Sequence, residues 1–218
     1  MTYIPLGCKE AKGHAKSILS ATLTRMNTHK LILASGSPRR KELLERAGYS
    51  FEIIVSDVEE NAPEDIAPAE IAERNARLKA RAVAKDVDET AIVIGADTVV
   101  SIDGVVFGKP SDEHEAKDML GRLSGRTHQV ITGVCLASGS TAKSFHVTTD
   151  VTFRELAQAE IDAYVACGEP MDKAGAYGIQ GAGGKLVDHI SGDYDNVVGL
   201  PVSALAQELQ TEYGITNV

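Results

Sequence analysis

Residues 91–100 constrain the fold of this chain more than any other segment, because they are apolar almost throughout. A half-solvated strand alternates polar and apolar residues, whereas a near-continuous apolar run is typical of a central strand buried on both faces. The sequence therefore predicts an α/β protein with this strand at its centre.

One acidic residue, Asp97, interrupts this apolar strand. An ionised carboxylate is costly in such surroundings unless it is paired, hydrogen-bonded or bound to a metal. Two interpretations are open: a structural aspartate satisfied by a bulge or turn beside Gly95, or a carboxylate with a catalytic or metal-binding role. The pattern favours the second.

A second segment, residues 31–40, reads as a strand, a turn of small residues and the start of a helix. Gly36 lets the backbone approach a ligand, Ser37 can cap the helix, and Pro38 suits its first position. The free N–H groups of a helix N-terminus bind anions, and Arg39 and Arg40 can grip phosphate oxygens bidentately. The segment predicts a phosphate site, although paired arginines also occur on solvated helix faces.

Two lysines lie close to the elements that carry these candidates. Asp103-Gly104 is a strong hairpin signal, so the strand after it pairs antiparallel with the central strand and brings Lys109 towards Asp97. Lys79 borders the apolar stripe of a predicted helix, where a surface lysine extending from the edge is the simpler interpretation.

The remaining patterns complete the expected order of elements. Helical periodicity and helix-start signals predict helices over 39–47, 69–83, 111–123, 158–166 and from 201 onwards. Runs rich in β-formers predict strands over 51–55, 127–137, 144–154, 185–190 and 196–198.

Composition excludes several classes of protein. With 22 Lys and Arg against 31 Asp and Glu, the net charge of −9 argues against a sequence-independent nucleic-acid binder. No apolar run is long enough to span a bilayer, and the first 30 residues lack the apolar core of a secretory signal. Three widely spaced cysteines fit a reducing compartment, so we expect a cytoplasmic protein without membrane partners.

The domain organisation follows from where the folding signals start. Residues 1–28 are rich in polar and small residues and predict a weakly ordered extension or a mis-called start. Residues 29–218 then form a single domain, which at this length can bury a full core as one unit or as two closely packed lobes.

The segment 172–184 contains five glycines, which indicates positive-φ turns or close approach of the backbone to a ligand. Its spacing matches neither a dinucleotide fingerprint nor a P-loop. Gln180, within it, offers one donor group and one acceptor that could read the edge of a base.

Taken together, the motifs SGSPRR, GADTVV, KP after the DG turn, DKAGAYGIQG and NVVGLP resemble the Maf family of nucleoside triphosphate pyrophosphatases. The resemblance runs from about Lys30 to Gly214. Thr98 and the YGIQ sequence are similar to the branch that acts on dTTP and UTP. The family implies a two-lobed α/β structure, similar to inosine triphosphatases, with an elongated mixed β-sheet flanked by helices, a central cleft and often a dimer.

The resemblance also implies a role for each candidate. The catalytic proton acceptor falls on Asp97, which with Glu60 would hold Mg²⁺ or Mn²⁺. The substrate-binding residues fall on Ser35, Arg39, Arg40, Lys79 and Lys109, and the residues that tune base choice fall on Arg39, Thr98 and Gln180.

The activity implied is the hydrolysis of dTTP, UTP and modified pyrimidine nucleotides to a nucleoside monophosphate and pyrophosphate, through water attack at the α-phosphorus. Two alternatives stay open on the sequence. The chain could be a nucleotide-binding regulator of septum formation without turnover, or a member of the family branch that acts on 7-methyl-GTP.

Overall fold

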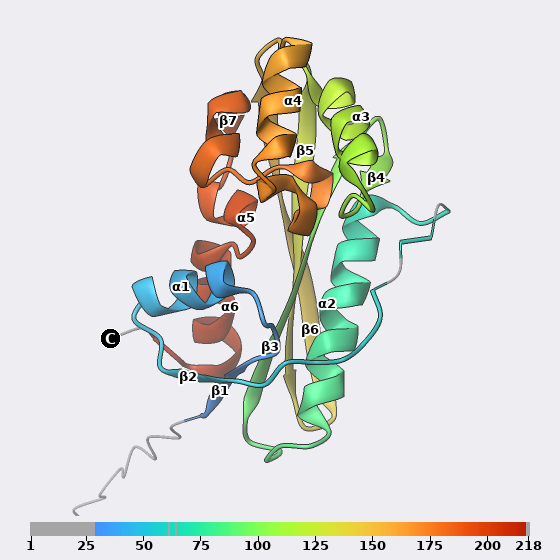
Figure 1. Cartoon of the computed structure of the whole chain (residues 1–218). Helices are drawn as coiled ribbons and strands as arrows, with labels where there is room; N and C mark the ends of the chain where they lie inside the picture. Colours follow the sequence, from blue (N-terminus) through green and yellow to red (C-terminus); the bar gives the residue numbers. More distant parts are fainter. Residues whose placement is uncertain (1–28, 61, 64, 217–218) are drawn as a thin grey trace, which may run out of the picture.

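The computed structural model describes residues 29–60, 62–63 and 65–216; the expected extension over residues 1–28 lies outside them. A seven-stranded mixed sheet in the order β2-β1-β3-β5-β6-β7, with β4 also paired to β3, forms its centre (Figure 1). β1, β2 and the start of β3 run parallel, and the other pairs are antiparallel. The strands are β1 (Leu31–Leu33), β2 (Phe51–Ile53), β3 (Ile92–Ile102), β4 (Val105–Phe107), β5 (Thr127–Ser138), β6 (Thr141–Phe153) and β7 (Val187–Ser191).

Helices cover both faces of this sheet. The α-helices are α1 (Pro38–Arg46), α2 (Pro68–Ala84), α3 (Glu113–Leu123), α4 (Gln158–Ala166), α5 (Tyr194–Val198) and α6 (Val202–Tyr213), with short 3₁₀ turns η1 (Glu169–Asp172), η2 (Ala174–Ala176) and η3 (Gly181–Leu186). α2 packs on one face against β3 and β5, through the apolar side chains of Ala76, Ala80 and Val93. α1 and α6 pack on the opposite face at one end of the long strands, and α3 and α4 pack at the other end.

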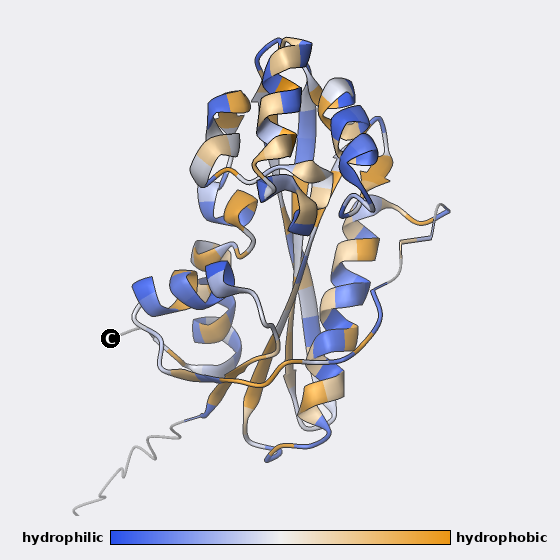
Figure 2. Cartoon of the chain, viewed as in Figure 1, coloured by the Kyte–Doolittle hydropathy of each residue, from blue (hydrophilic) through white to orange (hydrophobic). Residues whose placement is uncertain are grey.

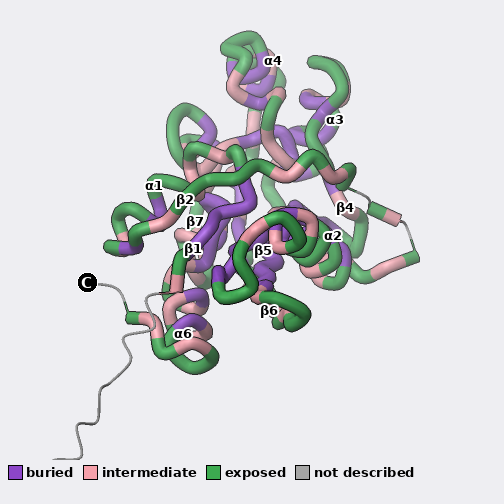
Figure 3. The backbone as a smooth tube through the Cα atoms, turned by 90° about the horizontal axis from the view of Figure 1, so that it is seen from below, coloured by how far each residue is buried: buried purple, intermediate pink, exposed green. Residues whose placement is uncertain are grey.

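The opposite face therefore carries two separate apolar cores. One contains Leu43 and Leu44 of α1 with Leu205 and Leu209 of α6, and the other contains residues of α3 and α4 around Phe153. β3, β5 and β6 run through both ends, so the two groups of helices form two lobes on one sheet (Figure 1). Hydrophobic and hydrophilic residues alternate along the helices in Figure 2, and Figure 3 shows buried residues both in the strands and in the helices that pack on them. The expected two-lobed architecture with an elongated mixed sheet is confirmed.

The edge of β3 that faces away from β5 is paired only at its ends. β1 pairs with Ile92–Ile94, and β4 pairs with Val100–Ile102. The stretch between them, which includes Asp97 and Thr98, has no partner strand on that edge among the described residues. Because side chains alternate along a strand, this gap gives access to residues on both faces of the sheet at once.

α2 lies unusually close to the sheet because two glycines face it. A Cβ at Gly95 would lie 2.8 Å from the backbone nitrogen of Ala80, and a Cβ at Gly133 would overlap the backbone of Ala72. α2 can lie this close to the sheet only because these two positions carry no side chain. The close packing brings the polar residues of α2 within reach of β3.

Several local expectations are corrected by the structure. Residues 196–198, expected as a strand, belong to α5, because the Asp193 side chain accepts the N–H groups of Asp195 and Asn196 and starts a helical turn. A short apolar run does not distinguish a strand from a helix.

Ser37 stands at the N-cap position of α1 but makes no side-chain capping bond. The cap of α3 is Asp112, one residue after the expected start at 111, and accepts the N–H of Glu115.

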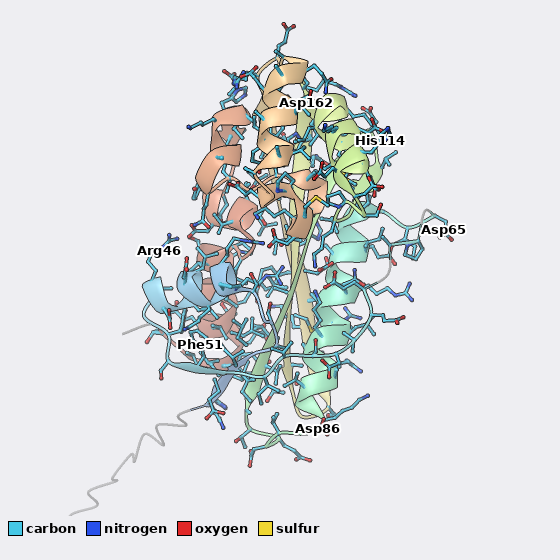
Figure 4. All side chains as sticks on the ribbon, in the orientation of Figure 1. Arg46, Phe51, Asp65, Asp86, His114 and Asp162 are labelled. Carbon is cyan, nitrogen blue, oxygen red and sulfur yellow. The ribbon has the colours of Figure 1, made fainter. Side chains whose placement is uncertain are left out.

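Charged side chains lie on the outer surface of the second lobe. Asp162 on α4 and His114 on α3, labelled in Figure 4, lie on the outside of their lobe, where Asp162 pairs with Lys117 at 2.9 Å. No helix of the described residues has both the length and the apolarity required to cross a membrane.

Candidate functional site

The gap on the edge of β3 opens into a cavity of about 740 Å³ between the two lobes. The first lobe contributes the β1–α1 turn and the Gly199 region, and the second contributes residues 169–181. Every site residue predicted from the sequence lines this one cavity: Ser35, Arg39, Arg40, Glu60, Lys79, Asp97, Thr98, Lys109 and Gln180.

Asp97 is buried, with 5% of its surface exposed, and both of its carboxylate oxygens are hydrogen-bonded. Lys79 Nζ donates to Oδ1 at 2.9 Å, and Asn75 Nδ2 donates to Oδ2 at 2.9 Å. The pairing of β3 with β5 is regular through Asp97, which lies opposite Gly133, so the alternative of a bulge beside Gly95 is wrong. Asp97 is a buried carboxylate at the wall of a cavity, compensated by an ammonium and an amide.

Lys79 is buried on the face of α2 that packs on the sheet, with 7% of its surface exposed. Its ammonium also donates to Ala96 O at 3.3 Å and forms an ion pair with Glu60 Oε1 at 2.7 Å. The surface position expected for Lys79 from its spacing is therefore wrong. The spacing places the residue near the edge of the stripe, but the two carboxylates compensate an ammonium that would otherwise be costly to bury.

Glu60 lies on the loop between β2 and α2, and 47% of its side chain is exposed. Partial burial opposes its ionisation, but the Lys79 hydrogen bond and the charges of Lys79, Lys109 and Arg40 outweigh it and hold the pKa of Glu60 below its ordinary value. Glu60 is thus an ionised carboxylate that faces the same ammonium as Asp97.

Three different nitrogen atoms of Arg40 donate hydrogen bonds to three different parts of the chain. Nε donates to Gly199 O at 2.8 Å, Nη1 to Ser35 Oγ at 3.1 Å and Nη2 to Thr98 Oγ1 at 3.1 Å. Burial lowers the pKa of the guanidinium, against the opposing charges of Asp97 and Glu60. Arg40 therefore ties the β1–α1 turn, the middle of β3 and the end of α5 together at the cavity wall.

These bonds make Arg40→Lys a severe change. A lysine has one nitrogen on a flexible stem and cannot reach the three acceptors at once. We expect the free energy of unfolding to fall by about 2 kcal/mol, because at least two hydrogen bonds to a charged group are lost. Urea denaturation monitored by circular dichroism measures this loss, with the exposed Arg46→Lys as a matched control that changes stability by less than about 0.5 kcal/mol. A midpoint equal to the control's would contradict the tying role of Arg40.

Arg39 stands at the N-terminus of α1 and faces the second lobe. Its guanidinium lies 3.7 Å from the Asp172 carboxylate in η1, and about a third of its side chain, 35%, is exposed. Gly36, Ser37 and Pro38 line the cavity beside it, at the positive end of the helix. Arg39 is thus a half-exposed cation at the opening between the lobes, next to a helix N-terminus.

The glycine-rich segment forms the wall that the second lobe contributes. The Glu169 carboxylate accepts the N–H groups of Ala182 and Gly183 and the hydroxyl of Tyr164, which fixes the turn after Gln180. Gly181 adopts φ +85°, a conformation that favours glycine. Gln180 is exposed and lines the cavity, as a residue that reads a base would have to be.

Sequence reasoning missed several polar residues of the site, among them Asn75, Glu169 and Lys173. Asn75 could have been found, because it lies four residues before Lys79 on the apolar stripe of α2, where a polar residue is unusual. Lys173 donates to Glu169 O at 2.7 Å and to Asp172 Oδ1 at 2.6 Å, contacts between neighbours in sequence that no periodic pattern reveals.

The carboxylates of the cavity match the needs of a divalent metal that arrives with a phosphate ligand. Among the residues that the structure describes, no group of three or more His, Cys, Asp and Glu side chains could hold a metal by itself. Glu60 and Asp97, however, converge on one point, the Lys79 ammonium. Mg²⁺ is commonly held by one or two carboxylates and completes its coordination with water and substrate phosphates, so this donor set fits such an ion.

Comparison with known proteins finds a matching family model and curated relatives. A family model described as Maf-like protein matches residues 30–212. A dTTP/UTP pyrophosphatase of Bacillus cereus is 54% identical over 184 residues, which cover 84% of this chain and 90% of the relative. A dTTP/UTP pyrophosphatase of Bacillus anthracis is 55% identical over 181 residues, covering 83% and 94%. The Ham1 protein of Staphylococcus aureus, a solved structure, matches with a TM-score of 0.41 and 19% identity, over 57% of this chain and 71% of that chain.

Proposed function

Since the chain belongs to the Maf family, we propose that it hydrolyses dTTP, UTP and modified pyrimidine nucleotides to a nucleoside monophosphate and pyrophosphate. The observation that carries this proposal is the buried Asp97 carboxylate, which lines the same cavity as the cations Arg39, Lys79 and Lys109. The identity to curated dTTP/UTP pyrophosphatases over more than four fifths of the chain supports the choice of pyrimidine substrates.

The charge of the cavity suits a polyphosphate. A nucleoside triphosphate carries several negative charges, and Arg39, Lys109 and the N-terminus of α1 supply positive charge to the cavity. Arg40 Nη1 donates to Ser35 Oγ at 3.1 Å. Ser35 and the N–H groups of Arg40 that make no bond to the protein would position the phosphates. These cations gather at one cavity of a chain whose net charge is −9.

Asp97 is the proposed proton acceptor for the attacking water. The water oxygen would bond to the α-phosphorus, its proton would pass to Asp97, and the bond from the α-phosphorus to the bridging oxygen would break to release pyrophosphate. The Asn75 hydrogen bond to Oδ2 helps to hold Asp97 in one orientation, which favours proton transfer at a defined point. Arg39, Lys79 and Lys109 would stabilise the charge that develops on the leaving pyrophosphate.

Glu60 and Asp97 are the residues that would hold a divalent ion, Mg²⁺ or Mn²⁺. When bound, such an ion supplies charge neutralisation and orientation of the phosphates. The base would lie towards Thr98 and Gln180, which with Arg39 are the proposed determinants of base choice. Both cysteines among the described residues, the buried Cys135 and the exposed Cys167, are free thiols, which supports the cytoplasm as the compartment.

A substrate panel tests this function directly. Purified protein is incubated with Mg²⁺ and, separately, dTTP, UTP, CTP and 7-methyl-GTP, and released pyrophosphate is measured. We expect kcat/KM for dTTP and UTP to exceed that for 7-methyl-GTP by at least about tenfold, because the cavity polar groups must pair with the base edge. Preference for the methylated purine would assign the chain to the other branch, and no release from any nucleotide above an Asp97→Ala control would identify a binding protein without turnover.

A further inference from the structure

The Lys79 ammonium occupies a position built entirely from oxygen atoms. It lies 2.7 Å from Glu60 Oε1, 2.9 Å from Asp97 Oδ1 and 3.3 Å from Ala96 O, so each of its three N–H groups has an acceptor. Two of these oxygens belong to the carboxylates that would hold a divalent ion. The hard oxygen ligands that suit an ammonium also suit Mg²⁺ and Mn²⁺.

We propose that Lys79 is the resident countercation of the metal site, which a divalent ion must displace and which then moves to the triphosphate of the substrate. This inference rests on the proposed function, because it presumes that Glu60 and Asp97 bind the metal. Two cations cannot share the same carboxylate oxygens without strong repulsion, so the ion and the ammonium compete. Lys79 would thus offset one of the two carboxylate charges before the metal arrives and carry its charge to the substrate afterwards.

The surroundings of Lys79 permit this exchange. Lys79 lines the cavity, and its flexible four-carbon stem lets the ammonium move while the backbone of α2 stays fixed on the glycines of the sheet. Asn75 donates to the other oxygen of Asp97, Oδ2, from one helical turn before Lys79. Asn75 can therefore keep the carboxylate oriented after the ammonium has left Oδ1.

The proposal has a thermodynamic consequence. In the absence of nucleotide, displacement separates Lys79 from both carboxylates without a phosphate to replace them, so the metal would bind weakly. With a triphosphate present, the ammonium gains phosphate oxygens, so metal and nucleotide strengthen each other's binding by the same factor. A neutral side chain at position 79 should abolish most of this coupling and strengthen the binding of the metal alone.

Mn²⁺ binding to the nucleotide-free full chain, followed by electron paramagnetic resonance of the free ion, tests the exchange. We expect Lys79→Met to bind Mn²⁺ on the order of tenfold more tightly than the wild type. The matched control is Lys109→Met, which removes the same charge from the same cavity. Lys109 acts on Glu60 through space, with no hydrogen bond to either carboxylate among the described residues. It should strengthen Mn²⁺ binding by less than about threefold.

A second measurement distinguishes a change in Mn²⁺ binding from loss of the fold. Thermal melts of the wild type, Lys79→Met and Lys79→Gln, each with and without Mn²⁺, should show a larger Mn²⁺-dependent rise in melting temperature for the two variants. Unchanged or weaker Mn²⁺ binding in both folded variants, an equal gain in Lys109→Met, or no detectable binding in any variant would overturn the proposal. If the wild type hydrolyses dTTP or UTP with Mn²⁺ while these binding results fail, only this inference is wrong; if it hydrolyses no nucleotide, the proposed function is wrong.

Discussion

Asp97→Asn is expected to lower kcat for dTTP hydrolysis by about 10²–10⁴-fold, the range that a positioned general base contributes. Asparagine keeps the size of the side chain and can still accept a hydrogen bond from Lys79, but it cannot take a proton from water. Because Glu60 still pairs with Lys79 at 2.7 Å, the ammonium keeps one carboxylate and the fold should persist. Steady-state kinetics with pyrophosphate detection measures the loss, and near-ultraviolet circular dichroism checks the fold.

The matched control for this variant is Asp103→Asn. Asp103 occupies the hairpin between β3 and β4 at φ +53°, a conformation that asparagine adopts readily, and its carboxylate pairs with Arg126 outside the cavity. Its kcat should stay within about twofold of the wild type. Full activity of Asp97→Asn would exclude Asp97 as the base, and rescue of its activity by raised Mn²⁺ concentration would assign Asp97 to metal binding alone.

Gly133→Ala is expected to lower the free energy of unfolding by about 3 kcal/mol, at the upper end for overpacking. The added Cβ would overlap the backbone of Ala72 and Glu73, and a backbone cannot rotate away as a long side chain can. α2 must therefore move off the sheet, which also carries Asn75 and Lys79 away from Asp97. Urea denaturation measures the stability, and we expect activity to fall together with it.

The control is the same substitution, glycine to alanine, at a position with free space around it. A Cβ at Gly121, inside α3, would meet no atom within 4 Å. Gly121→Ala should leave the protein as stable as the wild type or stabilise it by up to about 1 kcal/mol, because alanine restricts the unfolded chain and favours helix. A Gly133→Ala variant as stable as Gly121→Ala would show that the close approach of α2 is not required.

Much of the fold follows from local patterns. The run of residues 91–100 predicted a buried central strand, and β3 is buried at nearly every position. The hairpin at Asp103-Gly104 and the helix over 158–166 also appear as expected, because turn residues and helical periodicity act between neighbours in sequence. Residues 196–198 were predicted wrongly, because their conformation is decided by the Asp193 cap and Gly199 rather than by their own apolar character.

The candidate site, too, was predicted only in part from the sequence. The residue types were found, because an acidic residue in an apolar strand and an arginine pair at a helix start stand out against their neighbours. The surroundings of Lys79 and Arg40 were not found. Lys79, whose spacing indicated the surface, is buried between two carboxylates, and Arg40 binds Ser35, Thr98 and Gly199, contacts that no sequence pattern indicated. The contact of Arg40 with phosphate stays a prediction.

By itself, the sequence determined the order of elements, the buried strand and the chemical groups available to the site, since each depends on residues a few positions apart. Only the tertiary structure decided which charges meet. Asp97, Lys79 and Glu60 come from a strand, a helix and a loop. They converge because, in the part of the chain that the structure describes, one edge of β3 is unpaired between β1 and β4, and because two glycines let α2 lie against the sheet. Pairing across such distances in the chain depends on how the layers pack, which no local pattern specifies.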